Sequence, residues 1–236
     1  MCGRYALKLL SAFLDEFPWI LPPTGVPEGA GDDRYNIAPT QPVAAVMGGD
    51  APHVEFVKWG LVPSWAKDPA VGNKMINARA ETLGERPAFR RLVADRRCLV
   101  PADGFYEWKT QGKRKTPYYV HLKSGRPFAL AGLWDEWRDP ATGAALKTCT
   151  IITTEPNAVV GALHNRMAVI VRPEAYRPWL ADGPLSAEEL ARVLSPYPAD
   201  AMEAYPVSPA VNSPRGEGPG LTRRVEAAAA EQPTLF

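Results

Sequence analysis

The spacing of hydrophobic residues changes from a helical pattern to a strand pattern along the first sixty residues. The helical pattern consists of apolar side chains three or four positions apart: Leu7, Leu10, Leu14 and Phe17. This spacing predicts a helix over residues 6–17. Two runs of strand-forming residues follow at 43–47 and 54–59, with Gly48-Gly49-Asp50 between them, which predicts a β-hairpin.

Short strand patterns dominate the middle of the chain. They cover residues 98–100, 104–108, 118–122, 128–134, 148–153 and 167–171. Nearly all are joined by short polar turns, so we predict an α+β fold with a mostly antiparallel β-sheet or barrel and flanking helices.

Helical signals lie on both sides of this region. Residues 79–93 are predicted as a helix that Pro87 breaks or bends, and residues 173–180 as a helix beginning at a proline. Ser186 and Glu189 form a capping box in front of further apolar positions.

The composition indicates one globular domain followed by a tail. Of 236 residues, 46% are hydrophobic and 22% are charged, which is ordinary globular usage. From about residue 209 the chain is rich in Pro, Gly, Ser and Ala without periodicity. We therefore predict a domain over 1–212 and a flexible tail over 213–236, and we expect a monomer.

Several classes of protein are excluded by missing patterns. No apolar run is long enough for a membrane span, and the first residues lack a secretory layout, so we expect a cytoplasmic protein that does not bind membranes. The three cysteines show no metal-ligand spacing, which argues against a metal site and a disulfide framework. Gly-rich nucleotide-binding loops are also missing, and we expect no cofactor.

Positive charge is concentrated in one segment, although the net charge is only +1. Residues 74–115 contain eleven Lys and Arg against five Asp and Glu. This excess is compatible with an anion-binding face and equally with a solvated surface. The charge distribution alone does not distinguish an anion-binding face from a solvated surface.

Cys2 offers distinctive chemistry if Met1 is removed, which we expect because a small residue follows it. An N-terminal cysteine carries an amine (pKa about 8) and a thiol (pKa about 8.5) on adjacent carbons, both partly deprotonated near neutral pH. With an aldehyde, the amine forms a Schiff base and the thiol closes a thiazolidine ring. Taken alone, Cys2 is also compatible with being merely a small residue after the initiator.

Two further residues are candidates for proton transfer. Glu107 lies between bulky aromatic residues in a predicted strand, where desolvation raises a carboxyl pKa. His164 stands at the edge of the 167–171 strand, next to an Asn-Arg pair. Local sequence favours Asn77 as a helix N-cap, and His53 and His121 as ordinary strand residues.

The pattern as a whole resembles the SOS-response-associated peptidase family. The resemblance is carried, in order, by segments 1–4, 34–41, 59–65, 77–82, 98–108, 131–134, 150–154 and 164–167. Their sequences include Met-Cys-Gly-Arg, Tyr-Asn-Ile-Ala-Pro-Thr-Gln, Trp-Gly-Leu-Val-Pro-Ser-Trp, Asn-Ala-Arg-Ala-Glu-Thr and His-Asn-Arg-Met. A series of eight ordered segments is highly specific.

The resemblance implies capture of abasic sites in single-stranded DNA during replication or the SOS response, in association with the nucleoid. It implies that Cys2 forms the covalent link, Asn77 places the amine, Glu107 transfers protons and His164 supports opening of the sugar ring. By the same resemblance, three arginines lie beside phosphates and one tryptophan stacks on a base: Arg4, Arg79, Arg166 and Trp65. Ala66 stands where some relatives carry a second aromatic residue, which weakens stacking on that side.

Two other functions remain open at this stage. The same residues would suit a cysteine peptidase or N-terminal-nucleophile amidohydrolase, as the family name suggests, or a non-covalent reader of damaged or modified DNA.

The tail ends in Gln232, Leu235 and Phe236, which fit the Gln-x-x-Leu-Phe pattern of peptides that dock on the bacterial sliding clamp. A chance match is also compatible with so short a pattern.

Overall fold

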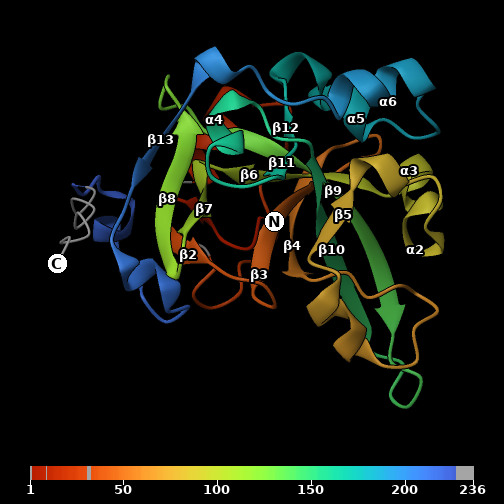
Figure 1. The fold of residues 1–236 in the computed structure, drawn as a ribbon. Coiled ribbons are helices and arrows are strands. Elements are labelled where there is room, and N and C mark those ends of the chain that lie inside the picture. The colour runs from red at the N-terminus through yellow and green to blue at the C-terminus, as the bar shows by residue number, and fades with distance from the viewer. Residues whose placement is uncertain (1, 9, 31–32, 227–236) are drawn as a thin grey trace, which may run out of the picture.

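The computed structural model describes residues 2–8, 10–30 and 33–226. In Figure 1, strands occupy the centre of the molecule and most helices lie at its upper and right-hand margins. The strands are β1 (Tyr5–Leu7), β2 (Arg34–Ile37), β3 (Pro42–Met47), β4 (His53–Trp59), β5 (Asn77–Arg79), β6 (Arg97–Ala102), β7 (Gly104–Gln111), β8 (Arg114–Leu122), β9 (Phe128–Arg138), β10 (Ala145–Thr154), β11 (Met167–Ala168), β12 (Ile170–Val171) and β13 (Met202–Pro206). The α-helices are α1 (Leu10–Glu16), α2 (Pro87–Arg90), α3 (Leu92–Asp95), α4 (Ala158–Gly161), α5 (Tyr176–Leu180) and α6 (Ala187–Val193). Shorter 3₁₀ turns are η1 (Pro69–Lys74), η2 (Ala80–Thr82), η3 (Pro173–Ala175), η4 (Ala199–Ala201), η5 (Pro209–Asn212) and η6 (Pro219–Thr222).

The larger sheet closes on itself. Its order is β11-β10-β4-β3-β6-β9-β12, and β9 also pairs with β10, so β10, β4, β3, β6 and β9 form a closed barrel. The β10–β4 and β10–β5 pairings are parallel, whereas the other pairings in this sheet are antiparallel. This barrel confirms the predicted α+β class with a mostly antiparallel core.

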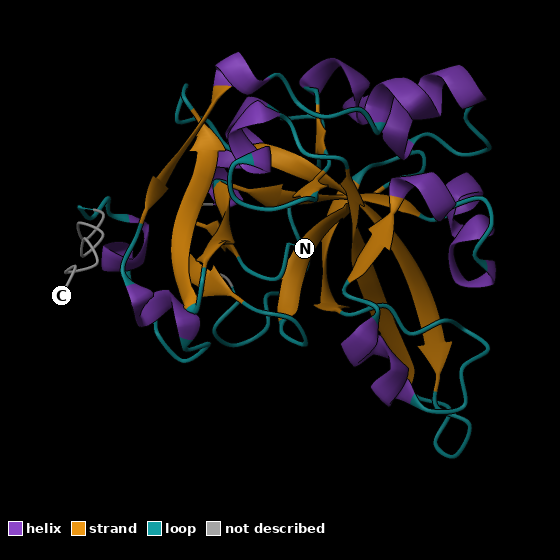
Figure 2. Ribbon diagram, viewed as in Figure 1, coloured by secondary structure: helices purple, strands orange, loops and turns teal. Residues whose placement is uncertain are grey.

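A second, five-stranded sheet has the order β13-β8-β7-β1-β2 and lies on the left in Figure 1. Figure 2 shows the two groups of strands, with most helices on the barrel side and above it and short helical turns outside the small sheet on the left. One buried cluster joins both sheets, because it contains Phe105 and Val120 of the small sheet together with Leu99 and Leu130 of the barrel. The sheets therefore share a single hydrophobic core.

The predicted hairpin is confirmed as β3 and β4, with Val43 paired to Val57. Gly49 has a φ of 102°, a conformation that L side chains rarely adopt. Gly48 allows a close approach to the chain, since a Cβ there would lie 2.0 Å from the carbonyl oxygen of Leu180. The two glycines thus permit this turn to pack against α5.

The predicted helix over 6–17 is wrong in its first part. Residues 5–7 form β1, which pairs with β7 and β2, and the helix begins only at Leu10. Tyr5 and Ala6 are fully buried in this strand, so sheet pairing overrides the local helical spacing.

The predicted helix over 79–93 is wrong at its start, whereas the predicted break at Pro87 is confirmed. Asn77, expected as an N-cap, lies in β5 and pairs with Ile151 of β10, so the chain there is extended. The helix that follows is broken: η2 ends at Thr82, and Pro87 begins the one-turn helix α2. A proline fits the first helical turn and disrupts an interior one, which accounts for the break.

The helical signals after residue 170 are confirmed. Pro173 begins η3, which leads directly into α5. The Ser186 side chain accepts from the Glu189 backbone N–H, and the Glu189 carboxylate accepts from the Ser186 N–H, which completes the capping box of α6.

Part of the segment assigned to the tail is folded. Leu221 of η6 is only 5% exposed and packs with Tyr106 and Val211. The Val225 N–H donates to Pro206 O, which attaches the segment to β13. Residues 213–226 therefore belong to the body of the protein, because one buried leucine anchors an otherwise polar stretch. Residues 227–236 of the predicted tail lie outside the described residues.

No helix in the described ranges is both long enough and apolar enough to cross a membrane.

Candidate functional site

The chain before β1 runs beside β7 toward Glu107. Tyr5 pairs with Phe105, and Arg4 O accepts a hydrogen bond of 2.9 Å from the Tyr106 N–H. Because the two strands are antiparallel, each residue before Tyr5 lies further along β7. The pairing therefore carries Cys2 toward the Glu107 end of that strand, and Cys2 is fully buried in the shared core.

Burial changes the acidity of Cys2. The pKa of its thiol is raised to about 12, chiefly by desolvation and then by the nearby Glu107 carboxylate, while a backbone hydrogen bond from Arg4 acts in the opposite direction. This raised pKa belongs to Cys2 in the chain that still carries Met1. The partly deprotonated thiol was expected for a chain that begins at Cys2, and it stays a prediction.

Glu107 is the buried carboxyl group of the site, with only 2% of its surface exposed. Burial raises its pKa, as the flanking aromatic residues predicted, and the electrostatic interaction with His164 lowers it in part. Glu107 therefore lies within electrostatic reach of both Cys2 and His164. A carboxyl group of raised pKa next to an imidazole is suited to proton transfer.

His164 is placed by the short helix α4 and the turn after it. The His164 N–H donates to Val160 O at 2.9 Å, and this hydrogen bond ties the turn back to α4. The Arg166 backbone N–H lies 3.0 Å from His164 Nδ1. A backbone N–H can only donate, so Nδ1 accepts in this contact, and the same Nδ1 lies 3.2 Å from Arg166 O.

Asn77 lies in β5, at the edge of the barrel. Its Nδ2 donates to Ile76 O at 3.0 Å and lies 3.4 Å from Ile151 O. Its Oδ1 is buried and has no hydrogen-bond partner among the described residues. Such an orphaned acceptor is available to a donor such as an amine.

Trp65 projects into solvent, with 68% of its surface exposed. The backbone on either side of it is fixed: the Ser64 N–H donates to the buried carboxylate of Asp135 at 2.8 Å, and Trp137 Nε1 donates to Ala66 O at 2.7 Å. The exposed indole is therefore presented by a rigid loop.

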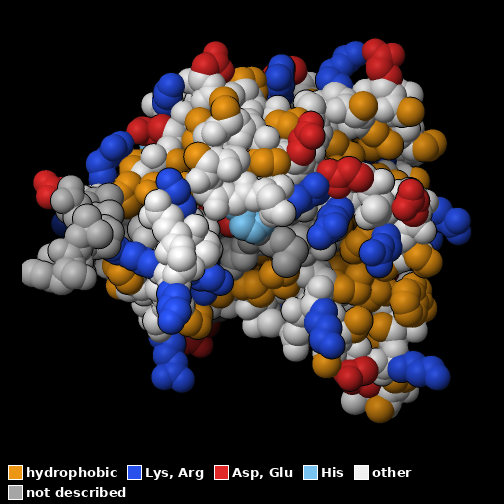
Figure 3. Space-filling view, in the orientation of Figure 1, with side chains coloured by type: hydrophobic (Ala, Val, Ile, Leu, Met, Phe, Trp, Pro, Cys, Tyr) orange, Lys and Arg blue, Asp and Glu red, His pale blue; other side chains and the backbone are white. Residues whose placement is uncertain are grey.

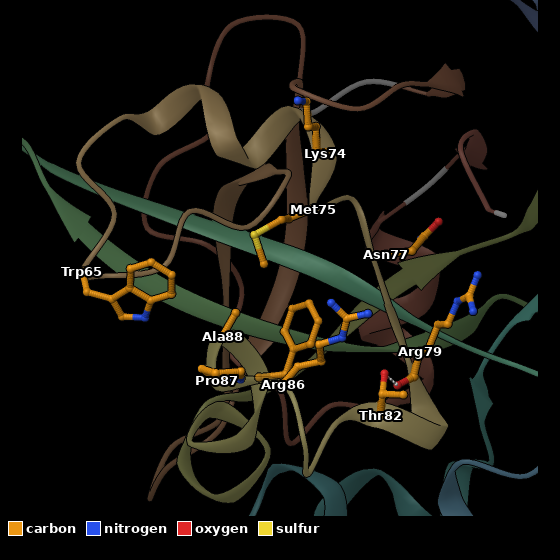
Figure 4. A pocket seen from close by; sticks show the side chains of 10 residues that line it. Trp65, Lys74, Met75, Asn77, Arg79, Thr82, Arg86, Pro87 and Ala88 are labelled. Carbon is orange, nitrogen blue, oxygen red and sulfur yellow. Dashed lines mark hydrogen bonds between the residues drawn. The ribbon is translucent and has the colours of Figure 1, made fainter.

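A pocket of about 400 Å³ begins at Trp65 and extends to Asn77 and Arg79. Figure 4 shows Trp65 at one end, Asn77 and Arg79 at the other, and Met75 and Arg86 between them. The remaining lining residues are Lys74, Thr82, Pro87, Ala88 and Phe89. The pocket thus combines an aromatic plane with three cationic side chains.

The three predicted phosphate-binding arginines have different surroundings. Arg79 is exposed, and its guanidinium has no hydrogen bond or ion pair within the described residues. Arg4 donates to Asn36 Oδ1 (2.7 Å) and Val211 O (2.8 Å).

Arg166 is held by two neighbours. Its Nη1 and Nη2 form a bidentate pair with the Glu81 carboxylate at 2.7 and 2.9 Å, and Nη2 also donates to Thr153 O at 2.6 Å. Only Arg79 of the three is therefore unengaged.

Sequence reasoning missed several residues of the site. Glu81, which the sequence places within the predicted helix over 79–93, binds Arg166. Met75 and Phe89 form apolar parts of the pocket, and no sequence signal distinguishes them from ordinary core positions. Lys74 and Arg86 carried a signal, since both lie in the basic segment 74–115. No group of three or more His, Cys, Asp or Glu side chains suited to a metal occurs in the described part of the chain.

The fold and the site together define an α+β protein that buries a cysteine near its N-terminus close to a carboxyl group, which in turn interacts with a histidine. The profile of the SOS response associated peptidase (SRAP) family matches residues 1–214, and the chain belongs to this family.

Individual relatives agree with that membership. The abasic site processing protein YoqW of Bacillus subtilis is 45% identical over 223 residues, which is 94% of this chain and 98% of the relative. The abasic site processing protein YedK of Escherichia coli is 30% identical and covers 95% of this chain and all of the relative. A crystal structure of a protein from Bacteroides thetaiotaomicron superposes with a TM-score of 0.85 at 28% identity, over 95% of this chain and 100% of that one.

Proposed function

We propose that this protein captures abasic sites in single-stranded DNA by forming a covalent link through Cys2. The observation that carries the proposal is the grouping of Cys2, Glu107 and His164 at the junction of the two sheets. Relatives over nearly the full chain length are named abasic site processing proteins, which supports the same substrate.

The reaction begins once Met1 has been removed and the Cys2 amine is free. The abasic sugar opens to an aldehyde, which requires proton transfer at the ring oxygen. Glu107, whose pKa is raised by burial, and His164 are the groups proposed to transfer this proton. The Cys2 amine then adds to the aldehyde carbon and the product loses water, which gives a Schiff base.

The thiol closes the ring. Sγ adds to the Schiff-base carbon, the S–H proton is transferred to the nitrogen, and a thiazolidine results with no oxidant or reductant. In this order the amine is the first nucleophile, and Glu107 accepts and returns protons. Asn77 Oδ1, which lacks a donor among the described residues, would orient the amine.

DNA binding is assigned to the pocket side of the site. Stacking of an exposed base on Trp65 and a phosphate contact from Arg79 would hold the strand without regard to sequence. Arg4 and Arg166 are already engaged with protein groups. Arg4 would place Cys2. Arg166 would place His164, or exchange Glu81 for a phosphate. We propose that the protein acts in this way as a monomer.

The test is to incubate the mature protein with an abasic single-stranded oligonucleotide and to look for a shifted band on a denaturing gel. Cys2→Ala should abolish the hydrolysis-resistant adduct, because it removes the ring-closing sulfur. Cys2→Ser should form a less stable adduct through its amine. One additional uncleavable residue before Cys2 should be as harmful as Cys2→Ala, since it turns the amine into an amide. A stable adduct with Cys2→Ala would refute the thiazolidine.

The same experiment separates the alternatives. Amide turnover without a DNA adduct would identify a cysteine peptidase or amidohydrolase, and reversible binding alone would identify a reader of damaged DNA. The raised thiol pKa counts against the peptidase, because a cysteine peptidase attacks as a thiolate.

We also propose that Gln232, Leu235 and Phe236 dock on the replication sliding clamp, although these residues lie outside the described part of the chain. Two large apolar residues at a chain end are suited to a small hydrophobic pocket on a partner. The affinity of full-length protein for the clamp should be on the order of micromolar. A chain truncated before Gln232 should lose clamp binding and keep crosslinking. Equal or absent clamp binding in both forms would remove the idea.

A further inference from the structure

The β7–β8 hairpin extends the face of the small sheet that carries Glu107. In β7, residues two apart share a face, so Lys109 and Gln111 lie on the Glu107 side. Across the hairpin, Lys109 pairs with Thr116 and Gln111 with Arg114, which places Arg114 on the same side. Lys115 pairs with Thr110 and lies on the opposite side.

Packing identifies the two faces. Phe105, two residues before Glu107, belongs to the buried cluster that contains Cys2. Tyr106 and Tyr119 point the other way and pack with Leu221 of the C-terminal segment. Lys109 and Arg114 therefore stand on the Cys2 face, while Lys115 stands on the face of the C-terminal segment.

The spacing of Lys109 and Arg114 along the hairpin fits a path that leads from the buried site to the surface. At about 3.4 Å per residue, Lys109 is about 7 Å from Glu107 along β7, and Arg114, opposite Gln111, is about 14 Å away. Burial decreases in the same direction, from buried Glu107 through half-buried Lys109 to exposed Arg114. A chain attached at Cys2 would meet these two cations in succession as it leaves the core.

Neither cation is used by the protein itself. Within the described residues, Lys109 and Arg114 make no side-chain hydrogen bond and no ion pair. Figure 3 shows Lys and Arg side chains on the left of the molecule, where the small sheet lies, as well as on the right beside a hollowed centre. Positive charge thus flanks the centre on two sides, and the pocket with Arg79 accounts for only one of them.

We propose that the Cys2 face of the β7–β8 hairpin binds the DNA backbone on one side of the captured nucleotide, through Lys109 and Arg114. The inference rests on the proposed function, which places a DNA strand at Cys2. Charge complementarity selects the occupant, since two unpaired cations spaced along a strand fit the phosphates of a single-stranded polyanion. The strand would then run from the Trp65 pocket, past Cys2, to the hairpin.

The test compares two kinds of charge-removing variants of the full chain: Lys109→Gln with Arg114→Gln on the Cys2 face, and Lys115→Gln as the matched control on the other face. Affinity for an undamaged single-stranded oligonucleotide is measured over a series of salt concentrations. The double variant should bind more weakly and reduce the magnitude of the salt slope by about 1.4, or about 0.7 for each lost phosphate contact. Lys115→Gln should bind as the wild type does.

Abasic oligonucleotides with a flank on only one side then locate the contact. The double variant should crosslink more slowly than wild type. This difference should be larger on oligonucleotides that keep the flank contacting the hairpin than on oligonucleotides that lack it. Equal salt slopes for the double variant and Lys115→Gln would overturn the proposal. Wild-type protein that binds undamaged strands but never crosslinks abasic ones would refute the proposed function, while the salt slopes would still decide whether the hairpin contacts DNA.

Discussion

Burial, more than sequence neighbours, sets the chemistry of the individual residues at this site. Cys2 and Glu107 are almost completely enclosed, and each is held toward its neutral form by desolvation. A thiol and a carboxyl group whose pKa values are both raised favour addition to an imine that needs a proton over hydrolytic attack by a thiolate. This contrast is why we prefer Schiff-base chemistry to peptide cleavage.

Glu107→Gln provides a test at the scale of one residue. Adduct formation and its reversal should both slow, by about 100- to 10,000-fold, because a proton-transfer group acts in both directions of one step. The rates are measured by quenched gel assays on abasic oligonucleotides. A normal rate in this variant would show that Glu107 does not transfer the proton.

The difference in stability between Glu107→Gln and wild type should change with pH in a definite direction. The pKa of Glu107 is raised in the folded protein, so the native state binds more protons than the unfolded chain, and wild-type stability falls as pH rises from about 4.3 toward the folded pKa. Glu107→Gln lacks this ionisation. Its free energy of unfolding relative to wild type should therefore increase over the same interval, measured by denaturant titration at several pH values. A relative stability that decreases with pH would contradict the assigned burial effect.

At the scale of elements, short pieces of structure place the catalytic candidates. Helix α4 has four residues and could not persist alone, since isolated helices of this length are unstable. It is held by Asn157, whose Oδ1 accepts from the N–H groups of Val159 (3.1 Å) and Val160 (3.0 Å) and whose Nδ2 donates to Tyr197 O at 2.7 Å. His164 follows directly, so its position depends on this cap.

Asn157→Ala should therefore lower stability by about 1 kcal/mol, as expected for a lost N-cap, and should also slow crosslinking by displacing His164. Asn157→Asp keeps an acceptor for the helix and should recover most of the capping contribution. Denaturant unfolding and the crosslinking rate are measured on both variants. A rate unaffected by Asn157→Ala would mean that α4 does not determine the position of His164.

At the scale of the whole molecule, the C-terminal segment reinforces the small sheet from outside. Leu221 packs on the face opposite Cys2, and Arg4 donates to Val211 O, so the two ends of the described chain meet across this sheet. The sheet that carries Glu107 is thus sandwiched between the shared core and this segment.

Leu221→Ala should destabilise the protein by about 2 kcal/mol, the lower end of the range for a buried leucine. Val225→Ala is the control, because Val225 is 36% exposed and holds β13 through its backbone; its effect should stay within about 0.5 kcal/mol. Thermal or denaturant unfolding of both variants measures the difference. Equal losses would show that the segment is attached by its backbone alone.

The sequence by itself determined strands β3, β4 and β6 to β12, the β3–β4 hairpin and the capping box of α6, and it named part of the candidate site. Alternation, turn residues and caps act over a few neighbouring positions, so they can be read without the fold. Tertiary structure decided what depends on distant partners. Pairing with β7 made residues 5–7 a strand, and pairing with β10 made Asn77 extended. Enclosure between two sheets gave Cys2 its raised pKa, and one leucine packed on the small sheet ordered a segment whose composition indicates a tail. Contacts between distant segments, and the desolvation that they cause, depend on the fold, so short-range sequence patterns do not predict them.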